Sequence, residues 1–255
     1  MTAPLLDRSL VPLRRARAEA MGADYFLHER AFDECLGRLA AVRRDFSTVL
    51  LLGEDRKGWT ERLRAADFKT VVIAGNDWTA PLPEAPDLCL SIGDLDSADD
   101  LPALLGAVRF LLAPDGLFLG AFAGGNSLAA LRTAMHAADR AAGSGAAAHV
   151  HPRIDPASFA GLLAAAGFVD PVVDVDRLSL RYASFDTLVR DLRRMASTNR
   201  LAERPRRPLL RTGLDAARRA FTALADHEGR TVETVDIVHF AAWSPATDLS
   251  RLTKN

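Results

Sequence analysis

Residues 49–58 read VLLLGEDRKG. The run from Ser47 to Leu52 has the length of a strand, and strands buried on both faces of a parallel sheet read in this apolar way. A glycine after such a strand lets the backbone approach a ligand closely, because it carries no β-carbon. Only Gly53 and Gly58 are glycines here, and the residues between them are all charged. The stretch therefore predicts a buried strand of an α/β fold, followed by a charged turn.

Strand-like and helix-like segments alternate outward from this stretch. Strands are predicted at residues 47–52, 70–74, 87–92, 117–122, 169–175, 177–182 and 231–243. Helices are predicted at residues 26–43, 59–66, 99–112, 127–140, 155–166, 185–195 and 209–225. This alternation predicts a doubly wound parallel sheet.

The chain of 255 residues is expected to form a single domain, because this length can bury one large core. Four parts are expected: an N-terminal helical arm at 1–45, an α/β core at 46–182, a helical insertion at 183–230 and a closing strand at 231–243.

Composition narrows the functional class. The formal net charge of −1 predicts no general attraction to nucleic acid or to a membrane surface. No segment approaches the roughly 18 uninterrupted apolar residues of a membrane span. The first residues lack the continuous apolar stretch of a signal peptide, so the expected location is the cytoplasm.

Short motifs, in order along the chain, resemble a known family. They are DRSL at 7–10, RRAR at 14–17, DYFL at 24–27, DLP at 100–102, LAPDGLFLG at 112–120, FAGGNSL at 122–128, HVHP at 149–152, AGF at 166–168 and RDLR at 190–193. The set is similar to the class I S-adenosylmethionine-dependent methyltransferase-like superfamily. More narrowly, it resembles the mitochondrial complex I assembly factors of methyltransferase-like type, which are arginine hydroxylases, and their alphaproteobacterial relatives. The malonyl-carrier methyltransferases of biotin synthesis are a more distant comparison.

The resemblance implies a Rossmann-like class I methyltransferase sheet that binds S-adenosylmethionine at its edge. The positions that correspond to the cofactor site are Gly53, Glu54, Gly58, Gly75 and Asp94. The resemblance also implies a protein partner, with respiratory complex I subunits as the candidates. No catalytic residue and no metal ligand is assigned.

The chain departs from the family pattern in the cofactor loop and at the ribose anchor. Leu51 stands where the family has an acid, and charged residues stand where small ones are expected. Glu54 and Asp55 are expected to face the cofactor's own carboxylate, and like charges about 4 Å apart repel by roughly 1 kcal/mol in water. The second strand should end in an acid for the ribose hydroxyls, but Asp77 comes two residues late.

The third departure is a missing strand. Residues 76–87, NDWTAPLPEAPD, join two predicted strands, whereas a parallel strand with its crossover helix needs roughly 30 residues. Three prolines also exclude an ordinary helix there. In addition, Asp96 and Ser97 replace the His-Trp pair expected after the next strand. We therefore expect the sheet to be shortened on the cofactor side, with its third strand missing.

Three polar motifs have alternative interpretations. His149 and His151 are either two metal ligands or part of a hydrogen-bonded loop, and the loop is favoured because no third ligand accompanies them. The acidic residues of 94–100 also have two interpretations. In one they bind Mg²⁺ or a guanidinium substrate. In the other, Asp99 and Asp100 cap a helix and the remaining acids are solvated. The segment 124–127, GGNS, either cradles an anion or forms a turn with Asn126 or Ser127 as the helix N-cap.

Residues 190–219 carry ten arginines against three acidic residues, an excess of 10 − 3 = +7. No aromatic residue lies in this stretch, which argues against stacking on bases. A solvated helix face and an acidic protein partner are the two interpretations. The function expected from the whole sequence is a non-catalytic or divergent assembly or interaction factor, a pseudoenzyme in which S-adenosylmethionine binding is weak or lost. The alternative is an active methyltransferase or arginine hydroxylase acting on a protein.

Overall fold

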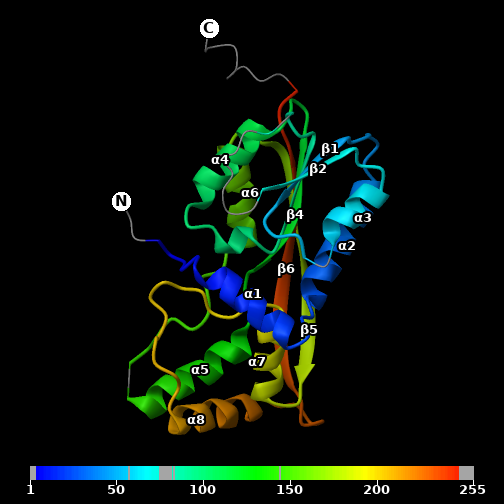
Figure 1. Cartoon of the computed structure of the whole chain (residues 1–255). Coiled ribbons are helices and arrows are strands. Elements are labelled where there is room, and N and C mark those ends of the chain that lie inside the picture. The colour runs from blue at the N-terminus through cyan, green and yellow to red at the C-terminus, as the bar shows by residue number, and fades with distance from the viewer. Residues whose placement is uncertain (1–3, 57, 75–81, 83, 144, 247–255) are drawn as a thin grey trace. The chain divides into compact units, whose positions relative to one another are not determined.

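The computed structural model describes residues 4–56, 58–74, 82, 84–143 and 145–246 (Figure 1). Contacts group the chain into two compact units. Unit 1 comprises Met1–Phe26, Gly124–Arg153 and Arg177–Asp236, and unit 2 comprises Leu27–Ala123, Ile154–Asp176 and Ile237–Asn255. Both units are assembled from interleaved segments, and the expectation of a single domain stays a prediction.

The strands form a six-stranded sheet of order β2-β1-β3-β4-β6-β5, of which β1, β2 and β3 lie wholly in unit 2. The strands are β1 Thr48–Leu52, β2 Thr70–Ala74, β3 Leu88–Ile92, β4 Leu117–Gly124, β5 Val169–Tyr182 and β6 Thr231–Trp243. β1 pairs in parallel with β2 and β3, and β3 pairs in parallel with β4. The predicted doubly wound parallel sheet is therefore confirmed.

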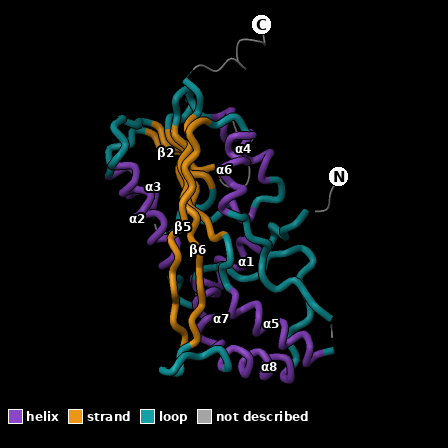
Figure 2. Tube along the Cα trace, turned by 180° about the vertical axis from the view of Figure 1, so that it is seen from behind, coloured by secondary structure: helices purple, strands orange, loops and turns teal. Residues whose placement is uncertain are grey.

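Helices cover both faces of the sheet in unit 2. They are α2 Phe26–Ala40, α3 Trp59–Ala65, α4 Leu101–Leu111 and α6 Pro156–Ala165, with a short 3₁₀ turn, η1, at Leu95–Ser97. Figure 2 shows α2 and α3 on one face and α4 and α6 on the other. α4 and α6 begin as predicted, because the Asp100 and Asp155 carboxylates each accept an amide hydrogen bond from the first turn.

The core of unit 2 is aliphatic at the strands and aromatic beside α6. Every residue of β1 and β3 is buried, as a strand covered on both faces requires. The aromatic part is a group of rings with centroids 4.8–6.2 Å apart, formed by Phe118, Phe122, Phe159, Phe168 and Phe240. Gly120 lies against it, since a β-carbon there would come within 2.2 Å of the Ser91 carbonyl oxygen and 2.7 Å of the Phe240 ring.

The sheet has the shortened form that the sequence predicts. Among the described residues, β2 is the last strand on its side of β1, and no further strand pairs with it. Residues 75–81 and 83 lie outside the described residues, and they include Gly75, Asn76 and Asp77. The positions assigned to the ribose anchor therefore stay predictions.

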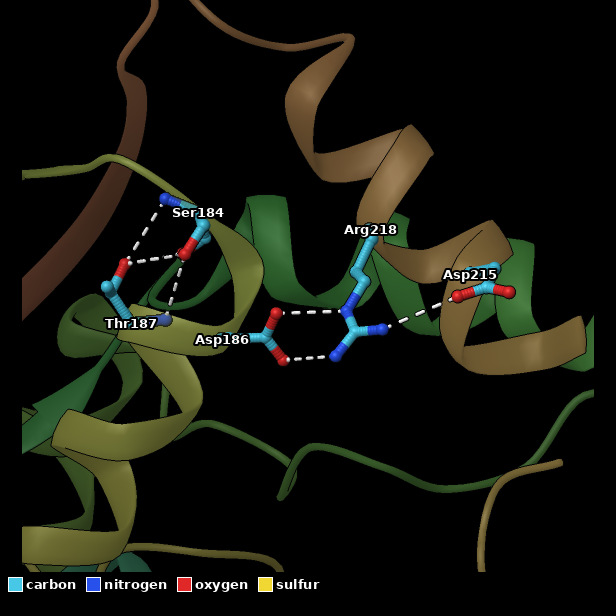
Figure 3. Close-up of polar contacts among 5 residues, drawn as sticks. All are labelled: Ser184, Asp186, Thr187, Asp215 and Arg218. Atoms are coloured by element: carbon cyan, nitrogen blue, oxygen red, sulfur yellow. Dashed lines mark hydrogen bonds and ion pairs between the residues drawn. The ribbon is translucent and has the colours of Figure 1, made fainter. Parts of the chain in front are cut away.

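Unit 1 is built on four helices. They are α1 Leu10–Ala20, α5 Ala129–Ala142, α7 Phe185–Arg194 and α8 Arg211–Thr222. α5 packs against α8, and α7 packs against both α1 and α8. Figure 3 shows the ion pair that joins α7 to α8. Arg218 of α8 donates to both carboxylate oxygens of Asp186 on α7, at 2.9 and 3.0 Å, and also pairs with Asp215. Ser184 and Thr187 form a capping box at the start of α7.

One strand prediction is wrong. The sequence predicts two strands, at 169–175 and 177–182, whereas β5 runs without interruption from Val169 to Tyr182. Asp176, which lies between the two predicted strands, continues the strand and accepts hydrogen bonds from Arg30 of α2 at 2.9 and 3.1 Å.

The predicted N-cap of α5 is also wrong. Neither Asn126 nor Ser127 caps the helix, which begins at Ala129. The buried Glu233 carboxylate of β6 accepts hydrogen bonds from the backbone amides of Ala130 and Leu131, at 3.1 and 2.8 Å. Burial raises the pKa of Glu233, and these amide hydrogen bonds act in the opposite direction. A carboxylate at a helix N-terminus also interacts favourably with the helix dipole.

The close approach at Gly120 gives a prediction. Gly120→Ala should lower the free energy of unfolding by about 2–3 kcal/mol, because the added β-carbon meets backbone and a packed ring. Gly106→Ala in α4 is the matched control, since nothing lies within 4 Å of its β-carbon position. It should leave stability unchanged or raise it by up to about 1 kcal/mol. Urea unfolding followed by circular dichroism measures both, and equal effects would contradict the packing account.

Candidate functional site

The carboxyl ends of β1 and β3 form the sheet edge at which open α/β sheets bind ligands. Gly53 directly follows β1, and Asp94 lies two residues after β3. Gly53 has φ 109°, a conformation that side-chain-bearing residues rarely adopt. A β-carbon at Gly53 would lie 2.0 Å from Asp94 Oδ2, so the Asp94 carboxylate occupies the space directly over the glycine. The structure thus brings these two predicted positions together.

Arg56 is the third residue at this edge, and its side chain lies against the end of β3. Its side chain is 9% exposed, and its guanidinium donates to the Ile92 carbonyl at 2.8 Å and to the two Asp94 oxygens at 3.1 and 3.3 Å. The two-nitrogen contact fixes the orientation of both groups. We name this pair, with its contact to the end of β3, the Arg56–Asp94 plug.

Aromatic and imidazole side chains support the plug. Trp59 stacks on Phe32 with a centroid distance of 4.7 Å, and the Arg56 guanidinium carbon lies 5.8 Å from the Trp59 ring centroid. Trp59 Nε1 donates to Glu29 at 2.9 Å, which ties α3 to α2. His28 of α2 lies over Gly93, where a β-carbon would meet its ring at 2.6 Å. The edge is therefore filled by protein side chains from α2, α3 and the loop between β1 and α3.

The structure corrects the expected roles of the acidic residues. Asp94 is not simply solvated, because it is ion-paired to Arg56 with a side chain 21% exposed. Asp55 accepts the Thr60 backbone amide at 3.1 Å, so it binds the first turn of α3. Glu54 is half-buried, and Gly58 precedes α3 with φ 74°.

A cavity of about 580 Å³ lies within unit 1. His149 and His151 line it, and both are hydrogen-bonded as the loop interpretation predicts. His149 Nε2 lies 2.8 Å from Asp139 Oδ1, and His151 Nε2 accepts the Arg200 backbone amide at 2.9 Å. Burial and the neighbouring Arg153 and Arg200 lower the pKa of His151 to about 4.

The described residues also lack two other features that would indicate a function. Nowhere in these residues do three or more His, Cys, Asp or Glu side chains gather in a way that could hold a metal ion. Within the same residues, no helix combines the length and apolar character that crossing a membrane requires.

Two residues that matter at the sheet edge and in unit 1 were not identified from the sequence. Arg56 is one of four consecutive charged residues after β1, and no motif distinguishes it from its neighbours. The signal for the pair is the fold itself, because an arginine after β1 and an acid after β3 meet at the same sheet edge. Glu233 lies in a strand pattern more than a hundred positions from the helix it caps. Only the fold brings that carboxylate to α5.

Comparison with models of known protein families gives no match. Individual proteins do match. The chain is 32% identical to the mitochondrial arginine-hydroxylase NDUFAF5 of Rattus norvegicus, over 88% of this chain and 72% of that protein. It is 33% identical to the malonyl-acyl-carrier-protein O-methyltransferase of Halorhodospira halophila, over 89% of this chain and 84% of that protein. The match to the zebrafish arginine-hydroxylase covers 57% of that protein.

Solved structures share the fold at low sequence identity. A Bacillus halodurans protein assigned as a methyltransferase superposes with a TM-score of 0.51 at 10% identity, covering 84% of this chain and 98% of that one. A Bacillus subtilis protein superposes with a TM-score of 0.50 at 11% identity, covering 84% and 99%. These likenesses agree with the Rossmann-like sheet described above.

The plug gives a stability prediction. Arg56→Met should lower the free energy of unfolding by about 2–3 kcal/mol, because Asp94 is left half-buried without its counter-ion. Asp94→Asn should cost a similar amount, and the double variant should be less destabilised than the sum of the two. Arg15→Met removes an exposed helical pair and is the control, with an expected effect below about 0.5 kcal/mol. Strict additivity of the two plug variants in urea unfolding would exclude a direct interaction.

His151 gives a pH prediction. Its folded pKa lies below the ordinary value, so as the pH falls from about 6.5 to 4 the unfolded chain binds a proton that the folded chain does not. Stability that is present above pH 6.5 is therefore lost over this interval, by about 3 kcal/mol. His151→Gln should remove that part of the loss, whereas His136→Gln on the exposed face of α5 should not. Urea midpoints at several pH values measure it, and an unchanged slope in His151→Gln would refute the assignment.

Proposed function

The chain belongs to the family of methyltransferase-like proteins that includes the NDUFAF5 arginine-hydroxylases and the malonyl-acyl-carrier-protein O-methyltransferases, and from that membership we propose that it is a divergent, non-catalytic member. Its role in this proposal is assembly or interaction with a protein partner, in the cytoplasm. By the resemblance of its motifs, respiratory complex I subunits are the candidate partners. S-adenosylmethionine binding is weak or lost.

The observation that carries the proposal is the Arg56–Asp94 plug. A class I cofactor site needs open backbone at the ends of these strands, and here a guanidinium, a carboxylate and the His28 ring fill that space. Admitting the cofactor would require breaking an ion pair whose members are 9% and 21% exposed. Opening such a pair without replacing its contacts is costly. The shortened sheet removes a second part of the site, since no described strand lies beyond β2.

An exposed basic surface supports the choice of a protein partner. Arg206, Arg207 and Arg211 are all exposed and have no carboxylate partner among the described residues. Leu210, between them, is 65% exposed. Exposed apolar and arginine side chains close together in the sequence favour a protein interface, where arginine is enriched. The complementary partner carries an acidic surface with an apolar pocket.

The alternative function is an active S-adenosylmethionine-dependent methyltransferase or arginine hydroxylase acting on a protein. Two observations favour it. The relatives' names state these activities, and an arginine at this edge has the geometry to pair with a ligand carboxylate if it releases Asp94.

The partner prediction concerns the basic surface. Affinity purification of the intact chain under low salt should recover a protein partner, and the complex should weaken as the salt concentration rises. A triple variant, Arg206→Glu with Arg207→Glu and Arg211→Glu, should lose the partner. Arg15→Glu with Arg64→Glu and Arg109→Glu changes the same net charge elsewhere and should retain it. Equal recovery with both triple variants, or no partner with the unaltered chain, would count against the interaction role.

The cofactor prediction concerns the loop after β1. Glu54→Gly with Asp55→Gly restores small residues in the loop but leaves the plug in place. The account expects no thermal stabilisation of this variant by 1 mM S-adenosylmethionine, a concentration that is about a thousand times a 1 μM dissociation constant and would add about 4 kcal/mol to stability if bound. Arg64→Ala in α3 is the control for nonspecific effects. Stabilisation of the glycine variant alone would assign the loss of binding to the loop acids and not to the plug.

A further inference from the structure

The cavity of unit 1 combines an apolar wall with a polar, cationic one. The apolar lining residues are Leu128, Leu131, Met135, Phe185, Val189, Leu192, Leu209 and Leu214. The polar lining residues used below are His151, Arg153, Arg190, Arg193, Thr198 and Asn199. At about 580 Å³ the cavity falls within the roughly 300–1,000 Å³ range of small-molecule sites.

The charge of the lining is strongly one-sided. Asp186 is the one carboxylate that lines the cavity within the described residues, and Arg218 already holds both of its oxygens (Figure 3). Arg218 is also paired with Asp215, so its charge is balanced within the protein. Arg153, Arg190 and Arg193 add three further positive charges to the lining, and Arg190 and Arg193 have no carboxylate partner among the described residues.

More arginines surround this side of the cavity. Arg14 of α1 donates to the Asn199 carbonyl at 3.2 Å, and burial together with the charges of Arg17, Arg193, Arg200 and Arg204 lowers its pKa. A protein that concentrates positive charge in this way raises its own electrostatic energy unless an anion is bound. Among these arginines, Arg204 is paired with the Asp7 carboxylate at 3.0 Å.

Buried polar atoms without a hydrogen-bond partner among the described residues include Thr198 Oγ1, on a lining residue, and Arg14 Nε, on the arginine that contacts Asn199. Buried polar atoms are nearly always hydrogen-bonded, so unmatched ones are typical of a site completed by a ligand. Both atoms are able to donate to an oxyanion.

We propose that this cavity binds a small organic anion, a carboxylate or phosphate group carried on a short apolar body. The arginine fork matches the oxygens of either group, and the leucine-rich wall accommodates the apolar part. The cationic lining excludes a free guanidinium or ammonium ligand. The site lies wholly within unit 1 and is independent of whether the sheet edge of unit 2 binds a cofactor.

Isothermal titration of the intact chain with three probes of similar length tests the proposal. Octanoate and octyl phosphate carry the two anions, and octylammonium carries the opposite charge. The proposal expects binding of at least one anion and none of octylammonium. Binding of octanoate alone identifies a carboxylate ligand, and binding of octyl phosphate alone identifies a phosphate ester.

Matched charge reversals locate the site. Arg193→Glu, in the lining, should weaken anion binding by at least about tenfold, as loss of a charge-assisted hydrogen bond implies. Arg219→Glu makes the same change in net charge on α8 outside the lining, and should alter binding by less than about twofold. Thr198→Val preserves volume and charge but removes the hydroxyl donor, so it should also weaken anion binding. This variant tests the site independently if Arg193→Glu fails to fold. No heat with either anion up to about 5 mM, equal binding of octylammonium, or equal losses in the Arg193 and Arg219 variants would overturn the proposal.

Discussion

The ion pair between Arg56 and Asp94 fixes the arrangement of side chains at the sheet edge of unit 2. It lies at the carboxyl ends of adjacent parallel strands, where an α/β sheet offers backbone amides and empty space to ligands. Gly53 must be a glycine for Asp94 to reach its place, and Gly93 must be one for His28 to lie over it. Trp59, stacked on Phe32 and bonded to Glu29, gives the arginine a rigid neighbour. Both glycines therefore admit the protein's own side chains at the sheet edge.

Much of the architecture could be predicted because it rests on local patterns. A few consecutive residues suffice to indicate several elements: the buried strands β1 and β3, the strand that ends at Trp243, and the aspartate-capped starts of α4 and α6. The absence of a strand beyond β2 among the described residues could be predicted from the length of one connecting segment, because residues 76–87 are too few for a strand and its crossover helix.

What could not be predicted depends on contacts between distant residues. β5 continues through Asp176, which is paired with Arg30 on another element. The cap of α5 comes from Glu233, more than a hundred residues away, and no pattern near Ala129 indicates it. The plug joins a loop residue to an acid 38 positions later. The loop was recognised as altered from its lost glycines, but the residue that fills the edge became visible only when the strands were in place.

The two units therefore differ in the space that they offer to a ligand. Side chains occupy the sheet edge of unit 2, whereas unit 1 has a cavity with a cationic lining. The central claim concerns the closed edge, and isothermal titration of the unaltered chain with S-adenosylmethionine and S-adenosylhomocysteine tests it most directly. The account predicts no binding heat up to about 1 mM of either ligand, which corresponds to a binding free energy weaker than about −4 kcal/mol. A dissociation constant near 1 μM, or about −8 kcal/mol, would contradict it and would mean that Arg56 releases Asp94 to admit the cofactor.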